Sequence, residues 1–253
     1  MKSIITFTMK EIVESVKTFK FIIIGFVFVF FGVSSPIMAK YLPQIIGTFD
    51  ANLAGVIPEP QIMDAYAQFF KNIGQIAFII MIIIFSGIVA QEKNKGTLVM
   101  ILSKKINRSI IIISKFAASA IIFSMCYLLA GIICWIYGSY LFPGEELHHI
   151  ILAMGSMWLF GMLTVSISIF FSTLLKNSSM AAMGSFVTWI LITLIGSIPK
   201  ISAYAPTVFS SKNLLMIQGM IELKDLIIPV IIVLIMIMGL LLISIYNFQR
   251  QEI

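Results

Sequence analysis

Long apolar runs separated by short polar segments dominate this chain. Six such runs contain no Lys, Arg, Asp, Glu or His, and they cover 21–38, 73–90, 116–142, 150–175, 180–198 and 226–246. A helix needs about 20 mostly apolar residues to cross the hydrocarbon core of a bilayer. The runs are continuous and do not alternate between apolar and polar residues, which disfavours the strands of a barrel. We therefore predict an all-α polytopic membrane protein with six transmembrane helices in a single domain over 1–253.

The segment 1–20 mixes charged residues with apolar residues at helical spacing. The apolar positions are Ile4, Ile5, Phe7, Ile12, Val13 and Val16. This periodicity predicts an amphipathic helix on the inner membrane surface, and the alternative is a polar lead-in to the first span. No small-x-small cleavage site closely follows the first span, so we expect that span to be retained rather than removed as a signal peptide.

Residues 39–72 form the longest polar connection. Its first half contains several residues that interrupt helices, namely Pro43, Gly47, Gly55, Pro58 and Pro60. These residues predict an irregular loop. In the second half, apolar residues recur at helical spacing from Ile62 to Ile73. This spacing predicts a short helix on the outer surface that leads into the second span.

Composition supports a membrane protein and disfavours a soluble enzyme. Apolar residues make up 60% of the chain and charged residues only 11%, against about 25% charged in soluble domains. The mean hydropathy is +1.06. The two cysteines, Cys126 and Cys134, lie in one apolar run and are too few for a disulfide framework.

The basic residues predict the orientation, because cytoplasmic loops of membrane proteins carry an excess of Lys and Arg. With the N-terminus in the cytoplasm, 12 of the 17 basic residues lie inside and 5 lie outside. We therefore expect a multi-pass protein of the cytoplasmic membrane with both termini in the cytoplasm. The net charge of +6 then reflects topology and attraction to anionic membrane lipid, and it requires no nucleic-acid partner.

In the inner loop, 91–115, charged residues flank a short apolar middle, 97–102. Thr97 fits the N-cap of a helix. The apolar residues that then share one face are Leu98, Ile101 and Leu102. This pattern predicts a short helix parallel to the membrane, with an apolar stripe facing the cytoplasm. The alternative is an ordinary loop whose lysines only fix the topology.

The same loop carries a resemblance to a known family. In chain order it contains Glu92, then Lys95-Gly96-Thr97-Leu98, then Leu102-Ser103, then Arg108 and Lys115. This order resembles the loop after the second span of type-2 ABC transporter permeases, where an acidic residue precedes Gly-Thr-Leu and a Lys opens the third span. The six-span layout is similar over the whole chain. Lys105 stands where the family usually has Pro, which leaves the end of the short helix open.

The resemblance implies an ATP-driven permease. In that family two six-span subunits pair, as a homodimer or with a close paralogue, and two separate ATPase subunits that bind ATP and Mg dock beneath them. The residues implied in coupling to the ATPase are Glu92, Gly96, Thr97, Leu98, Ile101, Leu102 and Arg108. The apolar stripe would enter a groove on the ATPase, and Glu92 would pair with Lys or Arg of neighbouring segments. An exposed ion pair contributes only about 0–1 kcal/mol, so Glu92→Ala is expected to be mild unless the pair is buried.

Catalytic chemistry of its own is not expected of this chain. The sequence lacks Gly-x-x-x-x-Gly-Lys-Ser/Thr and His-Glu-x-x-His. The predicted spans also lack the buried ionisable residues that ion-coupled transporters use. An acidic and histidine cluster after Pro143-Gly144 has the chemistry to bind a divalent metal, but no second set of ligands is evident and a hydrated turn is the favoured interpretation, so we expect no metal. That cluster consists of Glu145, Glu146, His148 and His149.

Small hydroxyl side chains recur in two predicted spans. They are Ser156, Thr164, Ser168 and Ser172 in the fourth span and Thr188 in the fifth. Such residues allow helices to pack closely, and the alternative is a path for substrate.

The leading hypothesis is the membrane subunit of an ABC exporter, with ATP hydrolysed by a separate subunit. One alternative is a membrane scaffold or assembly factor that only docks a cytoplasmic partner. The other is an ATP-independent channel or transporter.

Overall fold

The computed structural model describes residues 2–49, 59–98, 107–144, 147 and 149–251. The helices are α1 (Lys2–Lys17), α2 (Lys20–Phe49), α3 (Ile62–Asn72), the π-helix η1 (Ile73–Ala77), α4 (Phe78–Phe85), α5 (Gly87–Asn94), α7 (Arg108–Leu141), α8 (Ile150–Leu174), α9 (Ser178–Gly196), α10 (Val208–Ser211), α11 (Asn213–Ile217) and α12 (Leu223–Arg250). All regular structure in these ranges is helical, and six helical stretches are long and apolar enough to cross a membrane. The predicted all-α class with six spans is confirmed.

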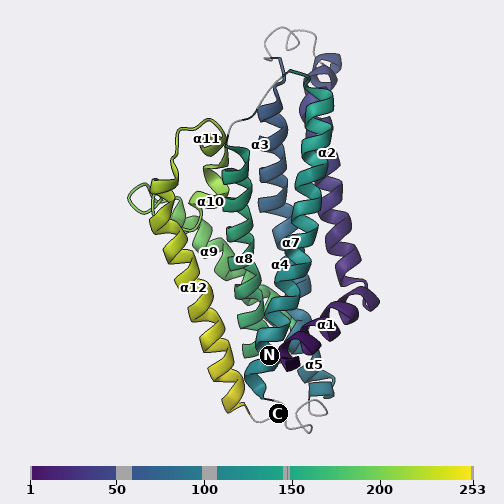
Figure 1. The fold of residues 1–253 in the computed structure, drawn as a ribbon, viewed down its shortest axis with the longest axis vertical. Coiled ribbons are helices and arrows are strands. Elements are labelled where there is room, and N and C mark those ends of the chain that lie inside the picture. The colour runs from purple at the N-terminus through teal and green to yellow at the C-terminus, as the bar shows by residue number, and fades with distance from the viewer. Residues whose placement is uncertain (1, 50–58, 99–106, 145–146, 148, 252–253) are drawn as a thin grey trace.

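The long helices stand side by side as a bundle (Figure 1). Both chain termini lie at the bottom of this view, which we call the proximal end, and the opposite end is the distal end. The central helix α8 contacts α4, α7, α9 and α12, together with the short helices α10 and α11. The interior contains a chain of aromatic rings in contact, formed by Phe28, Phe69, Phe78, Phe123, Tyr127 and Phe160.

Close helix packing in this core depends on small residues. A Cβ atom on Gly161 would lie 2.1 Å from Cζ of Phe123, so only glycine lets α8 approach α7 at this level. The buried aromatic rings then lie between the helices, where a protein interior is closely packed.

The first span is longer than predicted. Helix α2 continues through Pro36 and Pro43 to Phe49, well beyond the predicted end at residue 38. The prediction that Pro43 and Gly47 begin an irregular loop is therefore wrong. Each proline removes one helical hydrogen bond, and helix breakers are tolerated in membrane-spanning helices where neighbouring helices support the backbone. Helices α3 and α7 pack along α2 and provide that support.

The second span begins earlier than predicted. The predicted helix from Ile62 is present as α3, but it runs directly into η1 and α4 instead of lying on the outer surface. It stands beside α2 and α7 (Figure 1). Tyr66, Phe69 and Phe70 on its apolar face are buried. Because these rings pack against other helices, α3 runs along the bundle and not across its surface.

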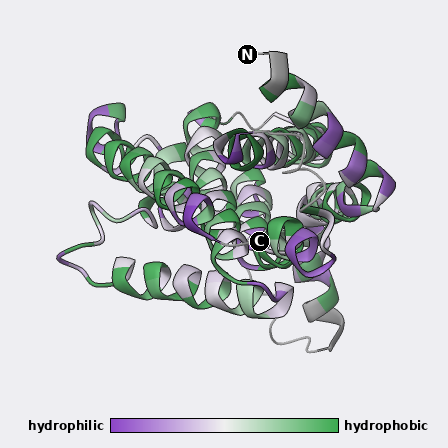
Figure 2. Cartoon of the chain, turned by 90° about the horizontal axis from the view of Figure 1, so that it is seen from below, coloured by the Kyte–Doolittle hydropathy of each residue, from purple (hydrophilic) through white to green (hydrophobic). Residues whose placement is uncertain are grey.

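Helix α1 directs its polar face towards the protein. Thr8, Glu11 and Ser15 are buried. Its large apolar side chains are exposed instead, namely Ile5, Met9, Val13 and Val16. Figure 2 views the bundle from the proximal end and shows hydrophilic positions along α1 against mostly hydrophobic helices elsewhere. The predicted helix is thus present, and its place on the membrane surface stays a prediction.

The remaining spans match the predicted ones with shifted ends. Helix α7 begins at Arg108 instead of residue 116, because the side chain of Asn107 accepts a hydrogen bond from Ser109 N at 3.1 Å and caps the helix there. Helices α8 and α9 lie within two residues of their predicted bounds. Helix α12 is longer than its apolar run at both ends.

Candidate coupling site at the proximal end

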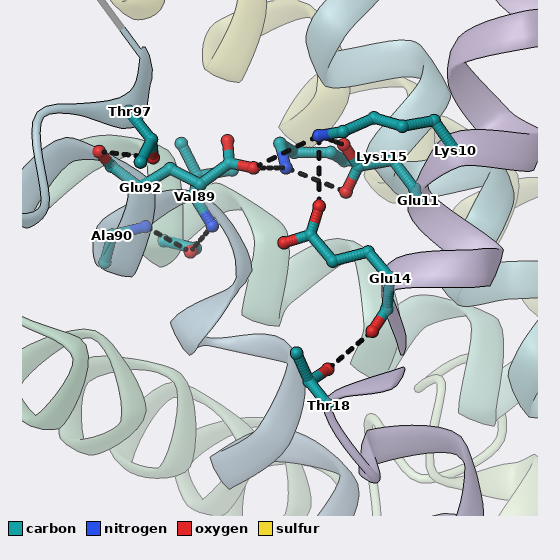
Figure 3. Close-up of polar contacts among 10 residues, drawn as sticks. Lys10, Glu11, Glu14, Thr18, Val89, Ala90, Glu92, Thr97 and Lys115 are labelled. Atoms are coloured by element: carbon teal, nitrogen blue, oxygen red, sulfur yellow. Dashed lines mark hydrogen bonds and ion pairs between the residues drawn. The ribbon is translucent and has the colours of Figure 1, made fainter. Parts of the chain in front are cut away.

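A buried lysine joins three helices at the proximal end. Lys115 of α7 is only 1% exposed. Its Nζ lies 2.8 Å from Oε2 of Glu11 on α1 and 2.9 Å from Oε1 of Glu92 on α5 (Figure 3). The ammonium group therefore ties the N-terminal helix and the end of the second span to the start of the third span.

A second lysine extends these contacts towards solvent. Nζ of Lys10 lies 3.2 Å from Glu11, 3.0 Å from Glu14 and 3.7 Å from Glu92 (Figure 3). We call these five residues, Lys10, Glu11, Glu14, Glu92 and Lys115, the proximal ion cluster. Three carboxylates and two ammonium groups give it a formal charge of −1, so nearly all of its charge is compensated internally.

The cluster changes the protonation equilibria of its exposed members. Partial burial acts to lower the pKa of Lys10, but the carboxylates of Glu11, Glu14 and Glu92 outweigh burial and raise it. Partial burial acts to raise the pKa of Glu14, but the hydrogen bond and the charge of Lys10, together with the charges of Lys115 and Lys20, outweigh burial and hold that pKa below 4.5. Both groups therefore remain charged around neutral pH.

Burial increases the loss of stability that is expected when one partner of these ion pairs is removed. Removing one partner of a buried pair leaves an uncompensated charge and costs about 3–5 kcal/mol, whereas an exposed pair is worth about 0–1 kcal/mol. The prediction that Glu92 pairs with lysines of neighbouring segments is confirmed. Its pair with Lys115 is buried, however, so the expectation of a mild effect for Glu92→Ala no longer holds.

The three carboxylates also have the spacing of a metal site, since their oxygens lie within 4.8 Å of one another. The ammonium groups of Lys10 and Lys115 already lie against these oxygens. The arrangement is therefore one of ion pairs between helices, and it gives no support to a metal centre.

The helix that carries Glu92 is separated from the rest of the second span by a break at Ser86. A helix start leaves backbone N–H groups without partners. Oγ of Ser172 on α8 accepts from Val89 N at 2.9 Å and from Ala90 N at 3.1 Å, and so satisfies two of them. The hydroxyl groups of Ser86 and Ser185 on α9 lie 3.0 Å apart. Helix α5 is thus a short unit attached to α8 and α9.

Arg108 anchors the end of the last span. Its Nη1 donates to the carbonyl oxygens of Phe248 at 2.9 Å, Gln249 at 3.1 Å and Gln251 at 2.6 Å. The last carbonyls of a helix have no partner within it, and a cation there also interacts favourably with the helix dipole. The predicted coupling residue therefore lies on the start of the third span and holds the C-terminal end of α12.

Lys93 adds a second tie at the same place. Its Nζ donates to the carbonyl of Thr173 at the end of α8, and to Oε1 of Gln251 at 2.6 Å. Nε2 of Gln251 donates to the Thr173 carbonyl at 3.1 Å. Hydrogen bonds from Lys93, Arg108 and Gln251 therefore join the proximal ends of α5, α7, α8 and α12.

The chain folds back on α5 directly after that helix ends. Gly96 has a φ of +70°, a left-handed conformation that favours glycine after the helix end. The hydroxyl of Thr97 donates to the carbonyl of Glu92 at 3.3 Å. Leu98 is fully buried in the core, so its predicted place on an exposed apolar stripe is wrong. The other two residues of that stripe, Ile101 and Leu102, lie outside the described residues.

Two of the small hydroxyl residues of the fourth span form hydrogen bonds within their own helix. Thr164 donates to the carbonyl of Phe160 and Ser168 to that of Thr164, and both are fully buried. Ser156 is 6% exposed and lines a cavity between α8 and α12. Thr188 is half-buried on α9. Of the acidic and histidine cluster, Glu145, Glu146 and His148 lie outside the described residues.

Sequence reasoning missed Lys10, Glu11 and Glu14 as partners of the loop. The available signal was the charge in segment 1–20, which contains carboxylates at Glu11 and Glu14 within one turn. Periodicity assigned these charges to solvent, because it records which residues share a face and not which face meets another helix.

Comparison with models of known protein families gives one match. The model of the ABC-2 family transporter proteins matches residues 5–253, which is almost the whole chain. None of the curated proteins compared with the chain matches it.

Proposed function

The chain belongs to the ABC-2 family transporter proteins, and we propose that it is the permease subunit of an exporter whose ATP is hydrolysed by a separate ATPase. The observation that carries the proposal is the proximal ion cluster, which joins the helix before the inner loop to the N-terminal helix and the third span. Two copies of the chain, or one copy and a close paralogue, would form the complete pathway.

In this proposal the inner loop transmits the motion of the ATPase. Force applied to the loop after Gly96 reaches α5 first, and Glu92 passes it to α7 through Lys115. The break at Ser86 lets α5 move as a unit relative to α4. Arg108 and Lys93 connect the same movement to α12. A shift shared by these helices is the type of two-state element that ATP and substrate can both bias.

The ATPase partner is the first thing to test. The tagged chain, purified in mild detergent from the cells that contain it, is expected to bring an ABC ATPase with it. Replacing Ile101 and Leu102 by Asp, in the loop segment implied in docking, is expected to reduce that recovery about a hundredfold, since desolvating each charge costs on the order of a few kcal/mol. Recovery of the ATPase at the wild-type level with this variant would favour docking elsewhere, and absence of any ATPase would favour the channel or scaffold alternatives.

The proposed orientation places the proximal end in the cytoplasm. Single cysteines at the exposed positions Asn94 and Ala203, in a chain with both native cysteines replaced by Ala, report the two sides of the membrane. An impermeant thiol reagent applied to intact cells should label position 203 and leave position 94 unlabelled. The reverse labelling pattern would overturn the orientation.

A further inference from the structure

A side cavity of about 620 Å³ lies towards the distal end, between the second span, α9 and the short helices α10 and α11. Its apolar wall consists of Phe70, Ile79, Phe160, Phe186, Ile190 and Leu214. The rings of Phe186 and Trp189 stack with their centroids 6.4 Å apart. A cavity of this size with mostly apolar walls is within the range that binds small organic ligands.

Two buried polar atoms at this side cavity, which we call the distal cavity, have no hydrogen-bond partner. Asn213 is 2% exposed, and its Oδ1 accepts no hydrogen bond. Nε1 of Trp189 is buried and has no acceptor. Both residues line the cavity. Because a buried polar group without a partner costs about 1–3 kcal/mol, two such groups at one cavity point to a ligand that satisfies them.

The charged group at the distal cavity is a cation. Among the described residues that line it, Lys71 is the only charged one, and no carboxylate of the described chain lies within ion-pair distance of it. The nearby Asp64 lines a neighbouring cavity with Lys71, and its Oδ2 accepts from Gln61 N at 2.9 Å. Gln75 adds an amide group to the lining of the distal cavity. The site therefore combines one cation with hydrogen-bonding groups of both kinds.

The backbone is also unusual at this place. Residues Ile73–Ala77 form a π-helix, which brings Gly74 and Gln75 to the cavity. Single π-helical turns are rare and occur frequently at functional sites. A Cβ atom on Gly74 would lie 3.0 Å from Cε of Met157, so the turn also fits closely against α8.

We propose that the distal cavity binds an anionic amphiphile, a molecule with one hydrocarbon chain and a head that carries a phosphate and a free hydroxyl. The phosphate lies against Lys71 and Gln75 and accepts from Trp189 Nε1, and the hydroxyl donates to Asn213 Oδ1. The hydrocarbon chain lies along the apolar wall. Only the further statement that this molecule is the transported cargo rests on the proposed function.

The test uses lysophosphatidic acid as the probe and Trp189 as the reporter. The chain contains three tryptophans, so Trp135→Phe with Trp158→Phe leaves Trp189 alone. With the full chain in a neutral detergent, lysophosphatidic acid is expected to change the Trp189 fluorescence in a saturable way. Lysophosphatidylcholine keeps the chain, the hydroxyl and a phosphodiester but has a zwitterionic head with no net charge, whereas glycerol 3-phosphate and inorganic phosphate lack the chain. Each is expected to bind at least about tenfold more weakly.

Variants locate the binding. Lys71→Gln and Asn213→Leu are each expected to weaken lysophosphatidic acid binding about tenfold, whereas the control Lys200→Gln, at an exposed lysine that does not line the cavity, leaves it unchanged. Equal binding of the neutral-headed lipid, or equal binding by Lys71→Gln, would overturn the proposal. Saturable binding without any ATPase partner would remove only the cargo role, and an ATPase-coupled chain without a Trp189 response would remove only this site.

Discussion

The proximal ion cluster and the distal cavity treat polar side chains in opposite ways. In the cluster, five charged groups from three helices lie within 4 Å of opposite charges. In the cavity, Trp189 and Asn213 bury polar atoms that have no partner, next to a single cation. One carboxylate oxygen of the cluster, Oε2 of Glu92, also has no hydrogen-bond partner, but every charged group there lies beside an opposite charge. Paired charges make a rigid junction between helices, whereas the two polar atoms at the cavity have no partner of any kind within the described chain.

The largest effect is expected from Lys115→Met. This change removes the buried cation between Glu11 and Glu92 and leaves only the more exposed Lys10 beside them. It should lower the free energy of unfolding by about 3 kcal/mol, the lower end of the range for a broken buried pair. Thermal unfolding in detergent measures the loss. The matched control is Lys224→Met, which breaks an ion pair with Glu222 that is well exposed on both sides, and it should change stability by about 0–1 kcal/mol. Similar effects of the two variants would mean that burial does not strengthen the cluster.

A smaller loss is expected from Glu92→Gln. Lys115 keeps its contact with Glu11 at 2.8 Å, so only part of the compensation disappears. The expected loss is about 1.5–3 kcal/mol, the range for a hydrogen bond to a charged group. Thermal unfolding of this variant beside Glu59→Gln, an exposed carboxylate at the distal end, distinguishes the cluster from a general effect of charge. A loss no greater than that of Glu59→Gln would restore the mild effect expected from sequence.

Acid should weaken the proximal end through Glu14. Because the folded protein holds the pKa of Glu14 below 4.5, its contribution is present above pH 4.5 and is lost as the pH falls through the lower folded value. Unfolding temperatures at neutral pH and near pH 4 should therefore differ less for Glu14→Gln than for the wild type. An identical acid loss in both proteins would show that Glu14 does not contribute. The effect should be small because Glu14 is only partly buried.

The smallest change in stability is expected at the cavity. Asn213→Leu removes a buried acceptor that has no donor, so stability in the absence of ligand should stay the same or rise by less than about 1 kcal/mol. Thermal unfolding without added lipid is the measurement. A loss comparable to that of Glu92→Gln would mean that Asn213 stabilises the fold through its contact with Met157.

Much of the fold follows from the sequence because membrane insertion depends on local composition. An uncharged run of about 20 residues predicts a span wherever it occurs, and each of the six predicted spans coincides with an apolar helix of the structure to within two residues at its C-terminal end or lies inside it. The ends of the helices were less predictable. A proline such as Pro43 interrupts most helices, yet α2 continues through it because α3 and α7 pack along α2. Local sequence does not record this packing.

The site was only partly predictable for a related reason. The resemblance identified Glu92 and Arg108, and the structure gives each of them partners in other helices. Neither the partner Glu11 nor the burial of Leu98 could be read from spacing, because both depend on how α1 and α5 pack against α7 and the core. The distal cavity has no sequence pattern at all, since its lining comes from separate segments of the chain.

ATP turnover of the complete complex, with and without lysophosphatidic acid, tests the link between the two regions most directly. The comparison uses the wild-type chain and Glu92→Gln, each reconstituted with the ATPase that co-purifies with it. Coupling through the proximal ion cluster predicts that the lipid stimulates turnover of the wild-type complex, and that Glu92→Gln keeps the ATPase and the Trp189 response but loses the stimulation. Full stimulation of the Glu92→Gln complex would contradict coupling through this cluster.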